Sequence, residues 1–94
     1  MTTGNSVLIV TQEVENYATW KGIYDNDKPN RDKARLIERF IIRDADKPNV
    51  VTVVFEAPDV GAARSFVSNP ELKAAMMKAG VKPAPSISIG SIAG

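Results

Sequence analysis

The sequence predicts a single α+β domain whose elements follow the order βαββαβ. Stretches rich in β-branched residues alternate with helical segments, and residues 36–80 contain a β-hairpin followed at once by a capped helical segment. In addition, both hairpin strands carry apolar residues on both faces, so each side of the sheet needs a cover. With 94 residues, the chain is expected to form one domain over residues 1–94.

The first half of the chain is predicted to hold a strand, a helix and a loop. Residues 6–14, SVLIVTQEV, are rich in β-branched residues and are typical of a strand. Asn16 is the expected cap of the helix that follows. Residues 27–35, DKPNRDKAR, are polar and predict a loop that can hold one helical turn after Asn30. The apolar residues at helical spacing form one stripe, which predicts that the aromatic side of the helix packs inward. The stripe consists of Val14, Tyr17, Trp20, Ile23 and Tyr24.

The hairpin is predicted to have strands at residues 36–43 and 50–57. The residues between them, DADKPN, are turn formers. Asp44 and Asp46 lie in this turn, where Asp is favoured for backbone reasons, and we therefore expect no metal site there.

The second helical segment is predicted to consist of two pieces. Asp59 is the expected cap of the first piece. The apolar residues change face near Asn69 and Pro70, so one straight helix cannot bury both sets and a break is predicted there. Gly80 is expected to end the second piece in a left-handed conformation. Residues 86–92, SISIGSI, then alternate as in a strand at the edge of a sheet.

This order of elements favours a four-stranded antiparallel sheet with the helices on one face, which is the ferredoxin-like arrangement. An isolated domain of this kind would have a polar second face. Here the strand at 50–57 is apolar on both sides, with Val51 and Val53 opposing Val50 and Val54. The simplest cover is the same face of a second copy, so the sequence predicts a homodimer whose sheets stack about 10 Å apart.

Composition excludes several classes of site and partner. The chain has no histidine and no cysteine, so a disulfide framework and a His or Cys metal site are not expected. Its 12 basic and 11 acidic residues are interleaved, without the one-sign cluster that nucleic-acid binding needs. No apolar run approaches the ~20 residues of a membrane span. No signal peptide is visible at the start, and a cytoplasmic location is expected.

Four runs of residues resemble the dimeric α+β barrel superfamily, and together they extend over nearly the whole chain. They are VENYATWK at 14–21, RDADKPN at 43–49, VVFEAPDV at 53–60 and FVSNPELKAAMMKAGV at 66–81. Within the superfamily, the chain looks most like small bacterial proteins grouped near the antibiotic biosynthesis monooxygenases, many of which are labelled hypothetical proteins or cyclases. The resemblance implies the ferredoxin-like fold and dimerisation.

The resemblance implies less about the reaction, because the superfamily holds cofactor-free monooxygenases, haem enzymes, lactone isomerases, polyketide cyclases and proteins without a known reaction. A haem member would be expected to offer a histidine ligand, which this chain lacks, so no cofactor is expected. Related sequences often carry a histidine near the end of the first strand, about where this chain has Gln12. The resemblance therefore does not extend to histidine-dependent acid–base chemistry.

A ligand pocket is predicted on the aromatic side of the first helix. Trp20 and Tyr24 are directed at the sheet, close to where superfamily members keep an apolar pocket for a planar ligand. Aromatic residues at helical spacing are more often core, so a purely structural role is the alternative. The expected lining comprises Trp20, Tyr24, Arg39, Phe40, Phe55, Phe66, Met76 and Met77.

Glu56 is the preferred candidate for a general base, and Asp25 is the second. An ion pair of Glu56 with Arg39 or Arg43, across the hairpin or across the dimer, is the alternative. Two functions follow as expectations. One is a cofactor-independent monooxygenase or cyclase acting on a polyketide-like or aromatic small molecule, and the other is a non-catalytic small-molecule-binding or structural dimeric module.

Overall fold

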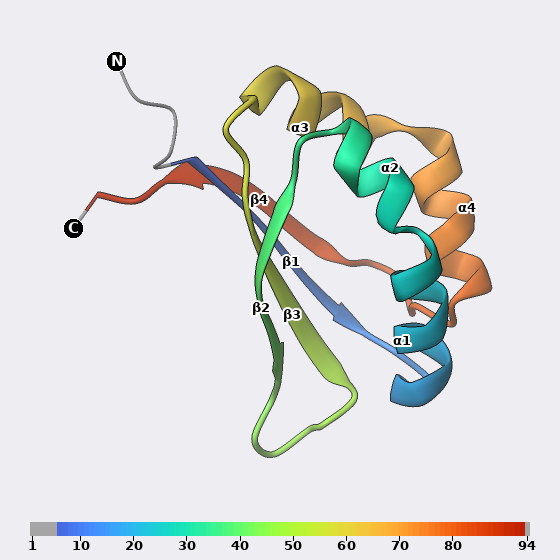
Figure 1. Ribbon diagram of the computed structural model, residues 1–94. Helices are drawn as coiled ribbons and strands as arrows, with labels where there is room; N and C mark the ends of the chain where they lie inside the picture. The colour runs from blue at the N-terminus through green and yellow to red at the C-terminus, as the bar shows by residue number, and fades with distance from the viewer. Residues whose placement is uncertain (1–5, 94) are drawn as a thin grey trace.

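Four strands form one antiparallel sheet, and the helices lie on one of its faces (Figure 1). The structure is a computed structural model, and it describes residues 6–93. The strands follow the order β2-β3-β1-β4 in the sheet. Their bounds are β1 Ser6–Glu13, β2 Ile37–Arg43, β3 Val50–Glu56 and β4 Ser86–Ser91. The helices are α1 Tyr17–Asn26, α2 Lys28–Lys33, α3 Val60–Ser68 and α4 Pro70–Lys78. The predicted ferredoxin-like arrangement is confirmed.

The predicted helix caps are present. Asn16 Oδ1 accepts a hydrogen bond from the backbone N–H of Thr19 at 2.9 Å, at the start of α1. Asp59 Oδ1 accepts one from the backbone N–H of Ala62 at 2.9 Å, at the start of α3. Each side chain satisfies an N–H group that has no partner within its helix.

The break in the second helical segment is also confirmed. Asn69 separates α3 from α4, and its Oδ1 accepts a hydrogen bond from the backbone N–H of Glu71 at 2.9 Å. Pro70 starts α4, where its missing N–H leaves no hydrogen bond unmade. Gly80 follows α4 with φ +80°, the left-handed conformation that was predicted for it.

The polar segment after α1 differs from its prediction. A loop with a turn after Asn30 was expected, but α2 begins earlier, at Lys28. Pro29 lies in the first turn of α2, where proline is compatible with a helix. The Nζ atom of Lys28 also lies 3.0 Å from Asp32 Oδ2, which supports the helix through an i,i+4 ion pair.

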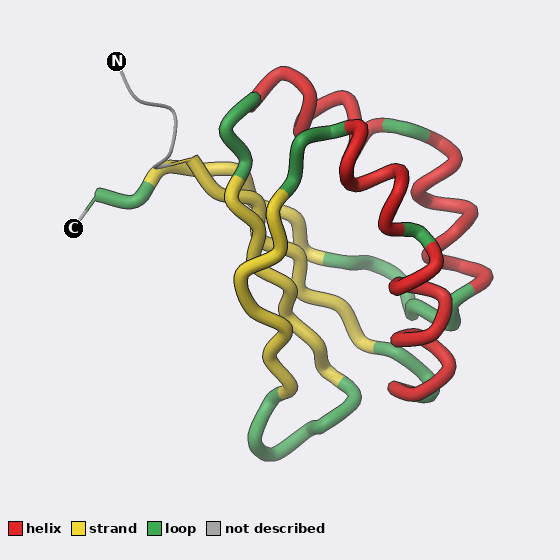
Figure 2. Tube along the Cα trace, viewed as in Figure 1, coloured by secondary structure: helices red, strands yellow, loops and turns green. Residues whose placement is uncertain are grey.

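The core lies between the helices and the sheet. Leu8, Val51, Val53 and Phe55 point from the sheet toward the helices and are buried. The outer face is different, since the helices cover only one side of the sheet (Figure 2). On β2, the outward side chains of Ile37, Phe40 and Ile42 are 50%, 58% and 49% exposed.

A β-bulge at Arg39 sets which β2 side chains face the helices. Glu38 pairs with Phe55 of β3, whereas Phe40 pairs with Val54, so Arg39 is an extra residue between them. Because directly paired residues point to the same face of a sheet, Glu38 faces the helices and Phe40 faces outward. Strict alternation would have placed these two side chains on the same face.

Candidate functional site

A cavity of about 60 Å³ lies between the helices and the sheet. Residues from both layers form its wall, which is predominantly apolar. The sheet contributes Val10, Gln12, Val53 and Phe55. The helical layer contributes Trp20, Tyr24, Arg31, Phe66, Leu72 and Met76. Five of the residues predicted from the sequence therefore meet at this cavity, namely Trp20, Tyr24, Phe55, Phe66 and Met76.

The aromatic side chains of α1 form one side of the cavity. Trp20 is 3% exposed, and its ring stacks on that of Tyr24 with centroids 4.8 Å apart. Tyr17 lies on the other side of Trp20, at 5.7 Å between centroids. The spacing of these residues in sequence places them one helical turn apart, which is why one face of α1 carries all three rings. A flat aromatic surface next to an apolar cavity is suited to a planar ligand.

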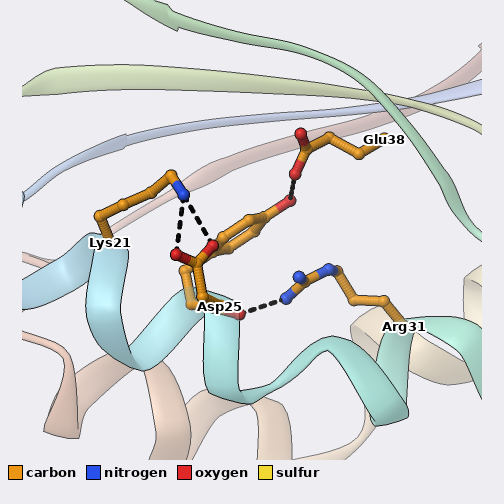
Figure 3. Close-up of polar contacts among 5 residues, drawn as sticks. Lys21, Asp25, Arg31 and Glu38 are labelled. Atoms are coloured by element: carbon orange, nitrogen blue, oxygen red, sulfur yellow. Dashed lines mark hydrogen bonds and ion pairs between the residues drawn. The ribbon is translucent and has the colours of Figure 1, made fainter.

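Tyr24 connects the cavity wall to β2 and to α2. Its Oη donates a hydrogen bond of 2.8 Å to Glu38 Oε1 (Figure 3). The guanidinium of Arg31 lies over the Tyr24 ring, 3.7 Å from the centroid, and Nη1 of Arg31 donates to the backbone oxygen of Tyr24. Burial, followed by the hydrogen bond to Glu38, raises the pKa of Tyr24 well above its ordinary value, although the positive charge of Arg31 acts in the opposite direction. Tyr24 is therefore a neutral hydrogen-bond donor at neutral pH.

Asp25 lies apart from the cavity wall. Both of its carboxylate oxygens accept hydrogen bonds from Lys21 Nζ, at 2.7 and 2.8 Å (Figure 3). This pairing with Asp25 holds the pKa of Lys21 above its ordinary value. The Asp25 side chain is 54% exposed. Its predicted role as a base stays a prediction.

Glu56 lies on the outer face of the sheet. It follows Phe55, which lines the cavity, and successive strand residues point to opposite faces. Glu56 Oε2 lies 3.0 Å from Arg39 Nη1, so the ion pair that was its alternative role is present. Phe40 lies on the same outer face. The structure thus brings Arg39, Phe40 and Glu56 together away from the cavity of this copy, and catalysis by Glu56 stays a prediction.

Gln12 and Arg31 also line the cavity, and the sequence reasoning did not include them in the pocket. Arg31 is 6% exposed, although its neighbours in α2 are polar and the segment was expected to be a loop. Gln12 is 5% exposed, and none of the described residues donates a hydrogen bond to its Oε1. Such an unpaired buried acceptor costs about 1–3 kcal/mol. The alternation from Leu8 and Val10 to Gln12 was the available signal, because it places all three on one face.

A second, larger cleft of about 270 Å³ adjoins the cavity. Asp27, Phe66 and Leu72 line both spaces. The other residues of this cleft are mostly polar: Asn30, Lys33, Ser65, Asn69 and Glu71. The two spaces together offer an apolar inner end and a polar outer end.

Residues 6–93 contain neither a cluster of metal-ligating side chains nor a membrane-spanning helix. Within this part of the chain, no group of three or more acidic, histidine or cysteine side chains is placed to hold a metal ion. None of the helices in the same range combines the length and the apolar character that crossing a membrane requires.

Comparison with known proteins shows the fold of this chain. A scan against protein-family models and a search of curated proteins found no match. Solved structures do match. One is a proposed antibiotic biosynthesis monooxygenase from Caulobacter crescentus, which is 14% identical to this chain. The match covers 99% of this chain and 94% of that chain, with a TM-score of 0.70.

Two further structures are described as oxygenases. A variant of SnoaB, a cofactor-independent oxygenase from Streptomyces nogalater, matches at 12% identity over 95% of this chain and 93% of its own, with a TM-score of 0.69. The ActVA-Orf6 monooxygenase of Streptomyces coelicolor, in complex with Nanaomycin D, matches at 18% identity over 98% of this chain and 90% of its own, with a TM-score of 0.68. At these identities the likeness shows a common fold, and it agrees with the fold that the sequence resemblance implied.

Proposed function

We propose that the protein binds a polyketide-like or aromatic small molecule and acts on it as a cofactor-independent monooxygenase or cyclase. The proposal is based on the cavity and on the fold that the chain shares with oxygenases, one of them cofactor-independent. The observation that carries this proposal is the stacked pair of Trp20 and Tyr24 on the wall of an apolar cavity. Two fold neighbours described as oxygenases support it, one of them solved with the ligand Nanaomycin D. The predicted cytoplasmic location is part of this proposal.

The size of the cavity limits how such a ligand binds. Its volume of about 60 Å³ is below the ~150 Å³ that admits a whole benzene ring in a buried cavity. A ligand of several rings would therefore place one end in the cavity and extend into the adjoining cleft of about 270 Å³. Met76 on the cavity wall and the side chains between the two spaces would adjust to its shape.

The proposed oxygenation uses O₂ as the second substrate. An activated CH₂ group of the ligand loses a proton, and the carbanion passes electrons to O₂. One oxygen atom then remains on carbon as a carbonyl, and the other leaves as water. Arg31 is placed to stabilise negative charge on the deprotonated ligand, because its guanidinium is buried at the cavity wall.

Three carboxylates are candidates for accepting the proton. Glu56 and Asp25 are the bases predicted from the sequence. Asp27 is a third candidate, since it lines both the cavity and the cleft, and its Oδ1 accepts a hydrogen bond of 2.6 Å from Asn30. Their replacement by the corresponding amides, one at a time, identifies the one that acts.

A homodimer is part of the proposal. The exposed side chains of Ile37, Phe40 and Ile42 form an apolar strip on the outer face of β2. On β1 and β3 the same face continues with Ile9 and Val54, which are only half-buried. The same face of a second copy, related by a two-fold axis, would cover this strip by sheet-on-sheet packing.

Ligand binding without turnover is the second candidate function. It is favoured by the positions of Glu56 and Asp25, since neither lines the cavity. In this case the cavity and its aromatic wall have the same role, but no bond is formed or broken.

Anthrone, a three-ring ketone with an activated CH₂ group, tests both candidates. Its binding is followed by the fluorescence of Trp20, the single tryptophan of the chain, and oxygenation by O₂ uptake and formation of the dione. Ala75→Phe fills the cavity from α4 and should abolish binding, whereas Ala74→Phe, on the exposed side of the same helix, is the matched control. Binding with O₂ uptake supports the monooxygenase, binding without a product supports the second candidate, and absence of binding contradicts both.

A further inference from the structure

Gln12 is a polar side chain buried in an apolar wall. It lies on β1 after Leu8 and Val10, on the face that the helices cover, and is 5% exposed. Its partner on β3 is Val51, whose side chain has no hydrogen-bond donor. No described residue donates a hydrogen bond to Gln12 Oε1. Because buried polar atoms in folded proteins are nearly always hydrogen-bonded, this oxygen is placed to accept a donor that the chain itself does not supply.

Other polar groups at the cavity already have partners within the chain. Tyr24 Oη donates to Glu38, and Arg31 Nη1 donates to the backbone oxygen of Tyr24 at 2.6 Å. Asp27 accepts a hydrogen bond from Asn30. Gln12 Oε1 is thus a buried acceptor that a ligand can use without breaking an existing hydrogen bond.

The shape of the site indicates which part of a ligand reaches Gln12. The cavity of about 60 Å³ exceeds the ~10–15 Å³ that one water needs, but it is smaller than a benzene-binding cavity. Water in so apolar a space would find few further partners, whereas the edge of an aromatic ring with one donor group matches both the wall and the acceptor. The remainder of the ligand would lie toward the polar cleft.

We infer that Gln12 determines ligand specificity, with Oε1 accepting a hydrogen bond from a hydroxyl or N–H group at the inner end of an aromatic small molecule. The inference rests on the proposed function, because it requires that the cavity takes a ligand. A ligand without the donor leaves the oxygen unpaired in an apolar site, so the protein discriminates against it.

Two probes of nearly equal shape test this inference. 1-Naphthol carries a hydroxyl group, and 1-fluoronaphthalene carries a fluorine in its place that cannot donate a hydrogen bond. Calorimetric titration of the full chain should give about tenfold tighter binding of 1-naphthol. Gln12→Met keeps the length of the side chain without the oxygen, and it should remove this preference by weakening the binding of 1-naphthol alone. Gln12→Glu keeps an acceptor and should keep the preference.

A second measurement reports on the amide group directly. Gln12 is the single glutamine of the chain, so ¹⁵N-labelled glutamine gives one pair of side-chain amide signals. 1-Naphthol should shift this pair, and 1-fluoronaphthalene should shift it less. This measurement needs no substitution at Gln12, so it remains decisive if a variant does not fold.

The outcomes separate the two proposals. Equal affinity of the wild-type protein for the two probes, with binding abolished by Ala75→Phe, overturns the role of Gln12 and leaves ligand binding in the cavity intact. A preference for 1-naphthol that persists in Gln12→Met also overturns it. If neither probe binds, ligand binding at the cavity fails, and the inference about Gln12 fails with it.

Discussion

Tyr24 Oη and Glu38 Oε1 are joined by a hydrogen bond of 2.8 Å, which links α1 to β2 (Figure 3). The two residues lie 14 positions apart in the sequence, on either side of α2, and the contact depends on Glu38 facing the helices. The bulge at Arg39 provides that orientation. The contact also fixes the position of an aromatic ring that lines the cavity.

The raised pKa of Tyr24 predicts a loss of stability in alkali. The folded-state pKa of Tyr24 lies above the unfolded value of 10.0. The contribution of this shift to the free energy of unfolding is therefore complete below pH 10, and it is lost as the pH rises toward the folded-state pKa. In a Tyr17→Phe variant Tyr24 is the only remaining tyrosine, and its phenolate absorbance should rise only above pH 10. Glu38→Gln should move the transition toward the ordinary value without reaching it, because burial is the larger cause. A transition at pH 10 in the Tyr17→Phe variant would contradict this prediction.

Arg31 is expected to stabilise the junction of α1 and α2. Arg31→Met removes a charged hydrogen bond to the Tyr24 backbone oxygen and the contact with the ring. The free energy of unfolding, measured with urea, should fall by about 1.5–3 kcal/mol. Lys33→Met, on the exposed side of the same helix, is the control and should change it by less than about 0.5 kcal/mol. Equal effects of the two substitutions would show that the Arg31 contacts contribute little.

The outer face of the sheet is expected to be the dimer interface. Phe40→Glu places a charge on a side chain that is 58% exposed in one copy and would be buried in the dimer. Light scattering coupled to chromatography should give a dimer for the wild-type protein and a monomer for Phe40→Glu. Met77→Glu, at a residue that is 68% exposed on α4, should remain a dimer. A wild-type monomer at micromolar concentration would rule the interface out.

Glu56→Gln separates the two roles that the sequence allowed for this residue. Its position on the face opposite the cavity predicts that turnover of anthrone stays within about twofold of wild type, since a base must reach the proton that it accepts. The dimer should weaken, because the ion pair with Arg39 becomes a neutral contact at the proposed interface. A loss of turnover of tenfold or more with the dimer intact would instead assign proton transfer to Glu56.

Local sequence signals predicted most of the fold. The caps at Asn16 and Asp59 and the left-handed Gly80 were predicted because each depends only on neighbouring backbone groups. The aromatic wall of the cavity was predicted for a similar reason, since the spacing of Trp20 and Tyr24 places them on one face of α1.

Interactions between distant segments could not be predicted in this way. A bulge depends on how two strands pair, so alternation along β2 did not show that Glu38 and Phe40 face opposite sides. Arg31 is buried at the cavity wall with its guanidinium against the Tyr24 ring, although the residues beside it in the sequence are polar.

The sequence by itself therefore determined the order of elements, the helix ends and the aromatic face of α1, all of which follow from periodicity and local hydrogen bonding. Only the tertiary structure decided which polar residues reach the cavity. In the folded structure, Glu56 and Arg39 lie on the outer face of the sheet. Gln12 Oε1 is a buried acceptor that receives no hydrogen bond from the described residues. The reason is physical: burial and pairing depend on packing partners that lie far apart in the chain.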